Sequence, residues 1–342
     1  MFTLPVQEIA MRSPLPTLDH LLAQHALNGA VALAFEHRLF DFLALPATAA
    51  QVAQHYDWQP HQTYHLLRLL WSTELLTHEA DCFVLAPDVH TYLCHDSRRY
   101  IGDAWRYRHQ VLQQFAQRLP QLLTQAEPGW QDPLRIDTAW ADAALHQIAQ
   151  EQRALSADTA CAIADTLADF QRPALLLDMG GGPGLISIAL AQRFPQLSVI
   201  VLDLPQTATV AQRNIEKAGL SDRGCALAKL PEGRQVDIIW SSSFLYFMAD
   251  RQAMLREWFT RLKPGGLLLS AHAEVPEQPE EARQVLPFFT PLMMRGYNVT
   301  NEGVLCEELQ QAGFDIERVQ RMQPFPMSPL DVIVARKPKT LS

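Results

Sequence analysis

A glycine-rich turn between an apolar run and a helical pattern places the strongest constraint on the fold of this chain. Three leucines at 175–177 lead into Asp178-Met179-Gly180-Gly181-Gly182-Pro183-Gly184, and a helical pattern follows at once. Glycines permit positive φ angles and let a ligand approach the backbone closely. A strand that turns directly into a helix is typical of open, parallel α/β sheets, which bind ligands at the carboxyl ends of their strands.

Strands and helices alternate through the rest of the C-terminal half, which indicates a parallel sheet. Helices are predicted at 185–194, 207–218, 250–262 and 300–312, and strands at 174–179, 197–203, 225–230, 236–241, 267–273, 314–320 and 330–335. We therefore predict an α/β fold with a Rossmann-like, seven-stranded catalytic domain over residues 171–342.

The N-terminal third is mainly helical by its apolar spacing. Helices are indicated between residues 18 and 43, after Thr48 as a capping residue, and from Pro60, and a short strand follows at 82–85. Three helices followed by a hairpin predict a winged helix within residues 15–115. Residues 116–170 are predicted to form a helical connector that contributes to the substrate pocket.

A second acidic residue, Asp203, ends the strand that follows the loop, at about the distance of roughly 20 residues expected of a ribose-binding acid. Asp178, at the head of the loop, can accept a hydrogen bond from an ammonium group. Leu185 occupies the position of the third dinucleotide glycine, which makes the turn less suitable for a pyrophosphate. From these residues alone, NAD binding and a loop whose glycines serve only helix–strand packing stay open as alternatives.

The acidic composition bears on the class of partner. The formal net charge is −9 at pH 7, whereas binding to nucleic-acid phosphates needs a basic surface. Between residues 59 and 76, inside the predicted winged helix, only Arg68 is positively charged. A winged-helix DNA-binding regulator is therefore a disfavoured alternative, and we expect a small-molecule partner and no nucleic acid.

Cysteine usage and apolar run length bear on metal binding and location. The five cysteines occur singly, which favours free thiols in a reducing compartment. His61 and His65 have the spacing of metal ligands on a helix, but no third ligand accompanies them, so we predict no metal site. No apolar run approaches the roughly 20 residues of a membrane span, and the first residues lack signal-peptide features. We expect a cytoplasmic protein without a membrane partner.

The loop and a second motif carry a resemblance to a known family. Asp178–Gly182 and Asp203-Leu204-Pro205 resemble the plant-type, caffeic acid O-methyltransferase-like family of class I small-molecule methyltransferases. Lys263-Pro264-Gly265-Gly266 and Ala312-Gly313-Phe314 are similar to weaker motifs of that family. The resemblance covers nearly the whole chain. It implies S-adenosyl-L-methionine as cofactor and a homodimer formed through the N-terminal winged-helix domain.

The resemblance also implies which residues bind the cofactor. Gly180, Gly182 and their neighbours are expected at the methionine portion, Asp203 at the ribose and Leu204 near the adenine. The full set of expected cofactor-binding residues is Asp178, Gly180, Gly181, Gly182, Gly184, Asp203, Leu204, Ser241 and Ser242.

The expected catalytic positions depart from the family pattern. The family usually has a His–Asp pair after the fourth strand, where this chain has Tyr246 and Phe247, and His272 replaces a supporting Glu. We hypothesise that Tyr246 orients or polarises the substrate and that His272 accepts its proton. The alternatives are that Tyr246 is a packing residue and His272 a buried, hydrogen-bonded histidine.

Bulky apolar residues suit a planar organic substrate. Phe288, Phe289 and Met293 are therefore predicted to bind it, with ordinary core packing as the alternative, together with Asn298, which aligns with a second family Glu. The predicted function is O- or C-methylation of a small aromatic or keto-type secondary metabolite. The alternatives are a family member that binds the cofactor but catalyses a hydroxylation or rearrangement, and an inactive partner subunit.

Overall fold

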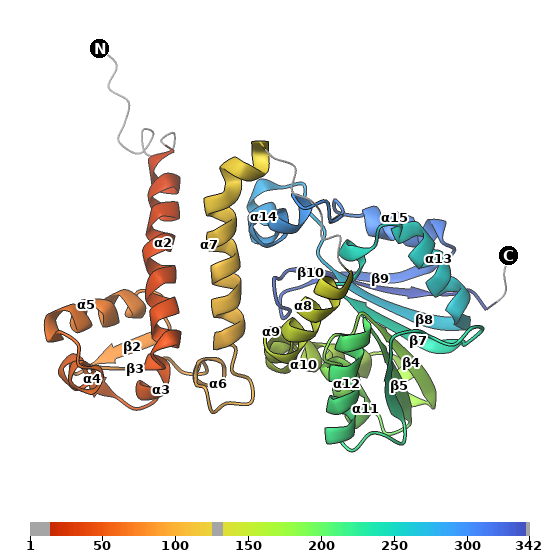
Figure 1. Cartoon of the computed structure of the whole chain (residues 1–342), viewed down its shortest axis with the longest axis horizontal. Coiled ribbons are helices and arrows are strands. Elements are labelled where there is room, and N and C mark those ends of the chain that lie inside the picture. The colour runs from red at the N-terminus through yellow and green to blue at the C-terminus, as the bar shows by residue number, and fades with distance from the viewer. Residues whose placement is uncertain (1–13, 125–132, 340–342) are drawn as a thin grey trace, which may run out of the picture. The chain divides into compact units, whose positions relative to one another are not determined.

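The computed structural model describes residues 14–124 and 133–339, which belong to two compact units (Figure 1). The first unit comprises residues 1–109 and the second 110–342, so the boundary lies within helix α7 (Gly102–Thr124). Each unit has a hydrophobic core of its own. Within the described ranges, no helix is both long and apolar enough to cross a membrane.

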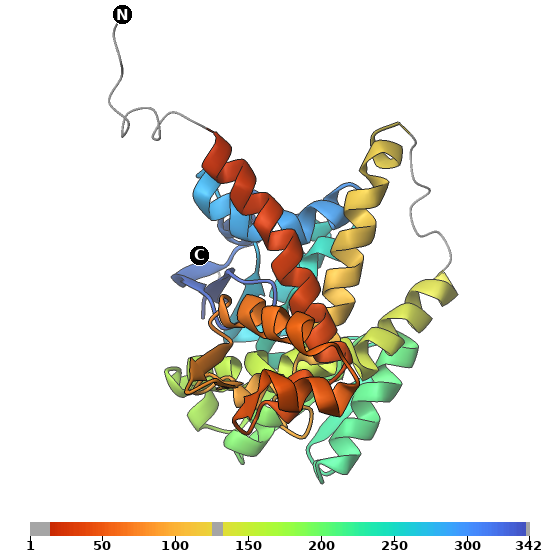
Figure 2. The same ribbon diagram turned by 90° about the vertical axis from the view of Figure 1, so that its left-hand side faces the viewer.

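The N-terminal unit combines helices with a small antiparallel sheet, and its short elements gather at the C-terminal end of α2 (Figure 2). Thr48 caps one of the helices, because its side chain accepts a hydrogen bond from the N–H of Gln51. The helices are α2 (Leu15–Glu36), α3 (Leu39–Phe42), α4 (Ala49–Tyr56), α5 (Pro60–Trp71) and α6 (His90–Leu93), and the strands are β1 (Ala47–Thr48), β2 (Leu76–Glu79) and β3 (Cys82–Leu85), in the order β1-β3-β2. The winged-helix assignment and the predicted boundaries at residues 115 and 170 stay predictions.

A seven-stranded mixed sheet forms the centre of the second unit, in the order β6-β5-β4-β7-β8-β10-β9. The strands are β4 (Ala174–Met179), β5 (Leu197–Leu202), β6 (Gly224–Leu227), β7 (Val236–Ser242), β8 (Leu262–His272), β9 (Asp315–Met322) and β10 (Leu330–Arg336). The pairings from β6 to β8 are parallel, whereas β10 is antiparallel to both of its neighbours. The predicted Rossmann-like class and all seven predicted strands are confirmed.

Helices cover both faces of this sheet (Figure 1). Successive residues of the buried strands point to opposite faces: Leu176 joins the core formed with α10, α11 and α12, whereas Leu177 joins the core formed with α13 and α15. These helices are α10 (Ala157–Asp165), α11 (Leu185–Arg193), α12 (Pro205–Lys217), α13 (Arg251–Arg261) and α15 (Val304–Gln311). Gly219 and Gly313 have positive φ angles after α12 and α15, as their predicted capping role requires.

The helical region before the sheet is divided into several short segments. It consists of α8 (Pro133–Leu145), α9 (Gln147–Glu151), the π-turn η1 (Gln152–Ser156), α10 and the 3₁₀ turn η2 (Ala168–Gln171). Helix α14 (Pro279–Met293), which follows β8, was not predicted. Its sequence contains Pro287 and Pro291, and prolines inside a helix remove backbone hydrogen bonds, so the pattern favours an irregular segment.

Candidate cofactor and active site

The glycine loop turns β4 into α11 through a left-handed backbone. Gly180, Gly182 and Gly184 have φ angles of 69°, 58° and 74°. A Cβ atom at Gly180 would lie 2.3 Å from the ring of Phe244, and one at Gly181 would lie 2.7 Å from the carboxyl group of Asp178. At Gly182 the nearest atom would be 3.5 Å away, on Ile148. The loop therefore excludes side chains at its base and leaves room at Gly182.

Asp203 holds the outer part of this loop from the carboxyl end of the neighbouring strand. Its Oδ2 accepts from the N–H of Gly182 (2.8 Å) and its Oδ1 from the N–H of Leu204 (2.7 Å). Burial raises the pKa of Asp203, and the two backbone hydrogen bonds act in the opposite direction. The carboxylate and the backbone N–H groups of the loop thus meet at one point of the sheet edge, and Leu204 is exposed beside them.

Asp178 lies in β4 at the base of the glycine loop. It is 2% exposed, and its Oδ2 accepts from the hydroxyl of Ser187 at 2.7 Å. Burial raises the pKa of Asp178 to about 7, against the effect of the Ser187 hydrogen bond. Its observed partner is therefore α11, and its contact with a cofactor ammonium group stays a prediction.

His272 lies at the carboxyl end of β8 with both ring nitrogens engaged. Nε2 accepts from the N–H groups of Phe244 and Leu245, each at 3.1 Å, so Nδ1 carries the hydrogen and donates to the hydroxyl of Ser270 at 2.8 Å. The side chain is 1% exposed. Burial lowers the pKa of His272 to about 3, and the charge of Arg251 acts in the same direction.

Tyr246 packs beside this histidine in the same core. It lies in the 3₁₀ turn η3 (Leu245–Phe247), is 4% exposed, and its ring centroid is 5.4 Å from that of His272. Its hydroxyl is hydrogen-bonded to the N–H of Ala273. Burial raises the pKa of Tyr246. The two side chains together tie the turn after β7 to the end of β8.

An aromatic wall that the sequence did not reveal lies near this turn. The ring centroid of Phe247 is 4.8 Å from that of Trp140 in α8 and 5.1 Å from that of Tyr297, which follows α14. All three side chains are half-buried. They are 50 or more residues apart along the chain, so no local pattern links them.

A family of methyltransferase domains matches residues 177–270. This segment runs from β4 to β8 and includes the glycine loop and Asp203.

Residues 177–270 thus match a methyltransferase domain. The match agrees with the predicted resemblance to small-molecule methyltransferases.

Two curated relatives from Streptomyces lavendulae match part of the chain. An L-tyrosine C(3)-methyltransferase is 29% identical over 178 residues, and a mitomycin biosynthesis 6-O-methyltransferase is 26% identical over 174 residues. Each alignment covers 49% of this chain and 49% of the relative, so the chain spans about half the length of the curated relatives it matches.

A solved structure supports the fold over nearly the full length. An O-methyltransferase family protein from Burkholderia thailandensis superimposes with a TM-score of 0.73 at 21% identity. The superposition covers 96% of this chain and 99% of that protein.

The methyltransferase domain does not arrange the predicted catalytic pair as hypothesised. Tyr246 and His272 are brought together, but in the core rather than at an open surface. His272 has no lone pair left to take a proton, because its accepting nitrogen already receives two backbone N–H groups. This geometry favours the alternative of a buried, hydrogen-bonded histidine over the hypothesis that His272 accepts the substrate proton, which stays a prediction.

The other predicted site residues of the domain differ in how far they are buried. Phe289 is fully buried against Tyr246, which fits a core residue, and its role in substrate binding stays a prediction. Ser241 is also fully buried, with its hydroxyl 3.4 Å from the carbonyl of Met179, which leaves it no exposed atom for a cofactor. Phe288, Met293 and Ser242 are half-buried, and Asn298 is exposed.

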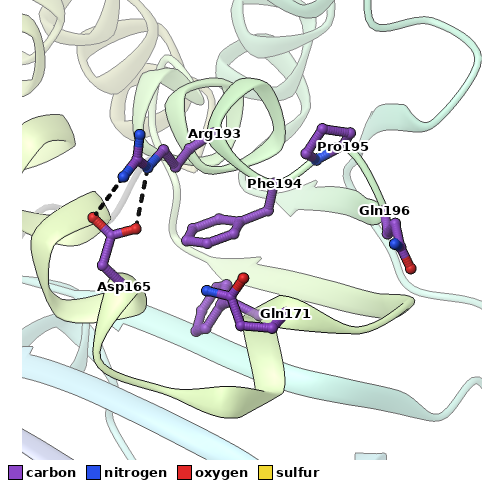
Figure 3. A pocket seen from close by; sticks show the side chains of 7 residues that line it. Asp165, Gln171, Arg193, Phe194, Pro195 and Gln196 are labelled. Atoms are coloured by element: carbon purple, nitrogen blue, oxygen red, sulfur yellow. Dashed lines mark hydrogen bonds and ion pairs between the residues drawn. The ribbon is translucent and has the colours of Figure 1, made fainter.

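A shallow hollow lies elsewhere in the domain, at the amino end of the sheet (Figure 3). It has a volume of about 260 Å³ and lies between η2 and the end of α11, where Arg193 forms an ion pair with Asp165 at 3.1 Å. Ligands of open α/β sheets bind at the opposite end of the strands, so this hollow is not the candidate site. Across the described part of the chain, no three His, Cys, Asp or Glu side chains come together as a metal-ligand set.

The protonation of His272 tests the assignment of this side chain to the core. A solvated histidine titrates near pH 6.5, whereas the buried ring requires its pKa to be about 3. We expect the His272 ring resonances, identified by their loss in His272→Gln, to keep the Nδ1–H tautomer from pH 7.5 to pH 5. Titration near pH 6.5 would restore His272 as a proton acceptor.

The same substitution tests the linked stability. Because the folded-state pKa lies below the unfolded value, the neutral ring stabilises the fold above pH 6.5, and this contribution falls as the pH is lowered toward 3. We expect the acid-induced loss of stability over this range to be smaller in His272→Gln than in the wild type, by urea unfolding. An identical pH dependence in both proteins would contradict the buried neutral state.

Proposed function

We propose that this chain is an S-adenosylmethionine-dependent methyltransferase that acts on a small aromatic or keto-type metabolite. The observation that carries the proposal is the contact between Asp203 and Gly182 at the carboxyl end of two adjacent parallel strands. It joins a carboxylate to a left-handed glycine loop that opens a helix, at the edge where ligands of this fold class bind.

The residues at this edge fit the cofactor. The glycine loop at Gly180 and Gly182 would contact its methionine portion, and the missing Cβ atom of Gly182 leaves room there. The carboxylate of Asp203 would accept from the ribose hydroxyls, and the exposed Leu204 would pack against the adenine. When bound, the cofactor supplies an electrophilic methyl group on a sulfonium ion.

The aromatic wall of Trp140, Phe247 and Tyr297 supports a planar acceptor. Edge-to-face rings present apolar surface to a flat ligand, and such surfaces are frequent in small-molecule sites. The names of the relatives include one C- and one O-methyltransferase, so both kinds of acceptor are compatible with the proposal. Orientation of the acceptor against the methyl group is the main contribution expected from the protein.

The proposal assigns positioning roles to Tyr246 and His272. His272 fixes the backbone of the turn after β7 through two hydrogen bonds, and Phe247 of the aromatic wall belongs to that turn. Tyr246 fixes the same turn against β8. Neither side chain is proposed to exchange a proton with the substrate.

Cofactor binding is tested by calorimetric titration of S-adenosylhomocysteine into the wild type and Asp203→Asn. Loss of the charged acceptor is expected to weaken binding about 10–100-fold, since hydrogen bonds to charged groups contribute about 1.5–3 kcal/mol. Asp222→Asn, an exposed aspartate of the same domain, serves as control and should bind as the wild type does. A folded wild type that binds neither S-adenosylhomocysteine nor S-adenosylmethionine would refute the proposal.

We further propose that the N-terminal unit forms a homodimer. Helix α2 carries Leu18, Leu21 and Leu22 with exposures of 51%, 60% and 72%. Large apolar side chains gathered on one helix mark an interaction surface. A second copy of the chain would bury these leucines by an isologous contact.

The dimer is tested by sedimentation of the double variant Leu18→Glu/Leu22→Glu. We expect a dimeric wild type and a variant whose dissociation constant is raised at least about tenfold, because charges would have to be buried in the contact. Leu45→Glu changes an equally exposed leucine of the same unit and should remain dimeric. A monomeric wild type at micromolar concentration would exclude the dimer.

A further inference from the structure

The side chain of Gln152 bridges two points of the glycine loop from a neighbouring helix. Its Nε2 donates to the carbonyl oxygen of Gly181 (3.2 Å), and its Oε1 accepts from the N–H of Leu185 (3.0 Å). Leu185 is the first residue of α11, whose N-cap is Gly184 and offers no side chain. Gln152 therefore supplies an acceptor for one of the first helical N–H groups, which lack a partner within the helix.

The π-turn η1 brings Gln152 to this position. The N–H of Ala157 donates to the carbonyl of Gln152, five residues earlier, instead of four as in an α-helix. Side-chain burial repeats at the same interval of five residues. Gln152 and Ala157 are buried, whereas Arg153 and Asp158 are exposed. In a continuous α-helix, residues five apart are rotated by about 140° and do not share a face.

The π-turn lets the residues before it and the residues after it pack against different parts of the domain. After it, Ala160 and Ile163 of α10 pack in the core of the sheet. Before it, Ile148 of α9 lies beside the loop, 3.5 Å from where a Cβ of Gly182 would be. The extra residue of the π-turn lets Gln152 face the loop without displacing α10. π-turns of this kind occur often at functional sites.

Gln152 and Asp203 hold different groups of the loop. Asp203 engages the N–H of Gly182, which would become available when its carboxylate accepts from a ribose. Gln152 engages the carbonyl of Gly181 and the N–H of Leu185, neither of which is a partner of Asp203. The side chain is 8% exposed, so losing it would leave the N–H of Leu185 without its acceptor in the interior, and the carbonyl of Gly181 with the N–H of Gly184 as its remaining donor.

We propose that Gln152 is a positioning residue of the cofactor site, which keeps the glycine loop in its ligand-accepting form independently of Asp203. The proposal rests on the cofactor assignment made above. It predicts that the loop loses its order and its affinity together when the two hydrogen bonds of Gln152 are removed.

The test replaces Gln152 by Met, which has similar length and no strong donor or acceptor. In Gln152→Met we expect S-adenosylhomocysteine to bind about 5–30-fold more weakly by calorimetry. We also expect the Leu185 amide of the unliganded protein to exchange with deuterium at least about tenfold faster. Gln192→Met, on the exposed side of α11, is the matched control and should change neither value.

The variant Gln152→Glu separates positioning from simple packing. Its carboxylate keeps an acceptor for Leu185 but cannot donate to Gly181, whereas its protonated form can do both. We expect its affinity relative to the wild type at the same pH to improve as the pH falls from 8 to 5.5. A packing role alone would leave this ratio unchanged. If Gln152→Met does not fold, the pH dependence of cofactor affinity in Gln152→Glu tests the proposal.

The outcomes distinguish this proposal from the cofactor assignment. Absence of binding by the folded wild type refutes the assignment and the present proposal with it. Binding by the wild type, with unchanged affinity and amide exchange in Gln152→Met, overturns the role of Gln152 alone. Weaker binding with faster Leu185 exchange supports it.

Discussion

The left-handed backbone of the glycine loop is the constraint on which the C-terminal unit depends. It turns β4, a central strand, directly into α11, and α11 then packs against β5 and α10. Gly180 and Gly181 have no room for a Cβ atom, because the ring of Phe244 and the carboxyl group of Asp178 occupy that space. The same contacts place the end of β7 and the base of the loop at one edge of the sheet.

Polar side chains from several elements stabilise this edge without closing it. Asp203 engages Gly182, Gln152 engages Gly181 and Leu185, and the side-chain amide of Asn214 donates to the carbonyl of Pro183 at 2.9 Å. Each contact gives a backbone group of this tight turn a hydrogen bond with a side chain. These contacts fix the backbone of the loop, and a fixed binding loop lowers the entropic cost of binding.

The fold could be predicted from the sequence because its signals are local. Leucines before glycines give β4 and the loop, and Asp203 follows at the spacing that neighbouring strands impose. The surroundings of Tyr246 and His272 could not be predicted, since burial and hydrogen-bond partners are set by the packing of distant segments. The π-turn at Gln152 has no pattern of its own, because it is defined by a backbone hydrogen bond between ordinary helix-forming residues.

The most direct test of the central claim is a crystal structure of the protein with S-adenosylhomocysteine. The account predicts the ligand at the carboxyl end of β4 and β5, with the Asp203 carboxylate within hydrogen-bond distance of the ribose hydroxyls and the Gln152 contacts to Gly181 and Leu185 unchanged. A ligand bound elsewhere, or an Asp203 that keeps its bond to Gly182 and does not touch the ribose, would contradict it.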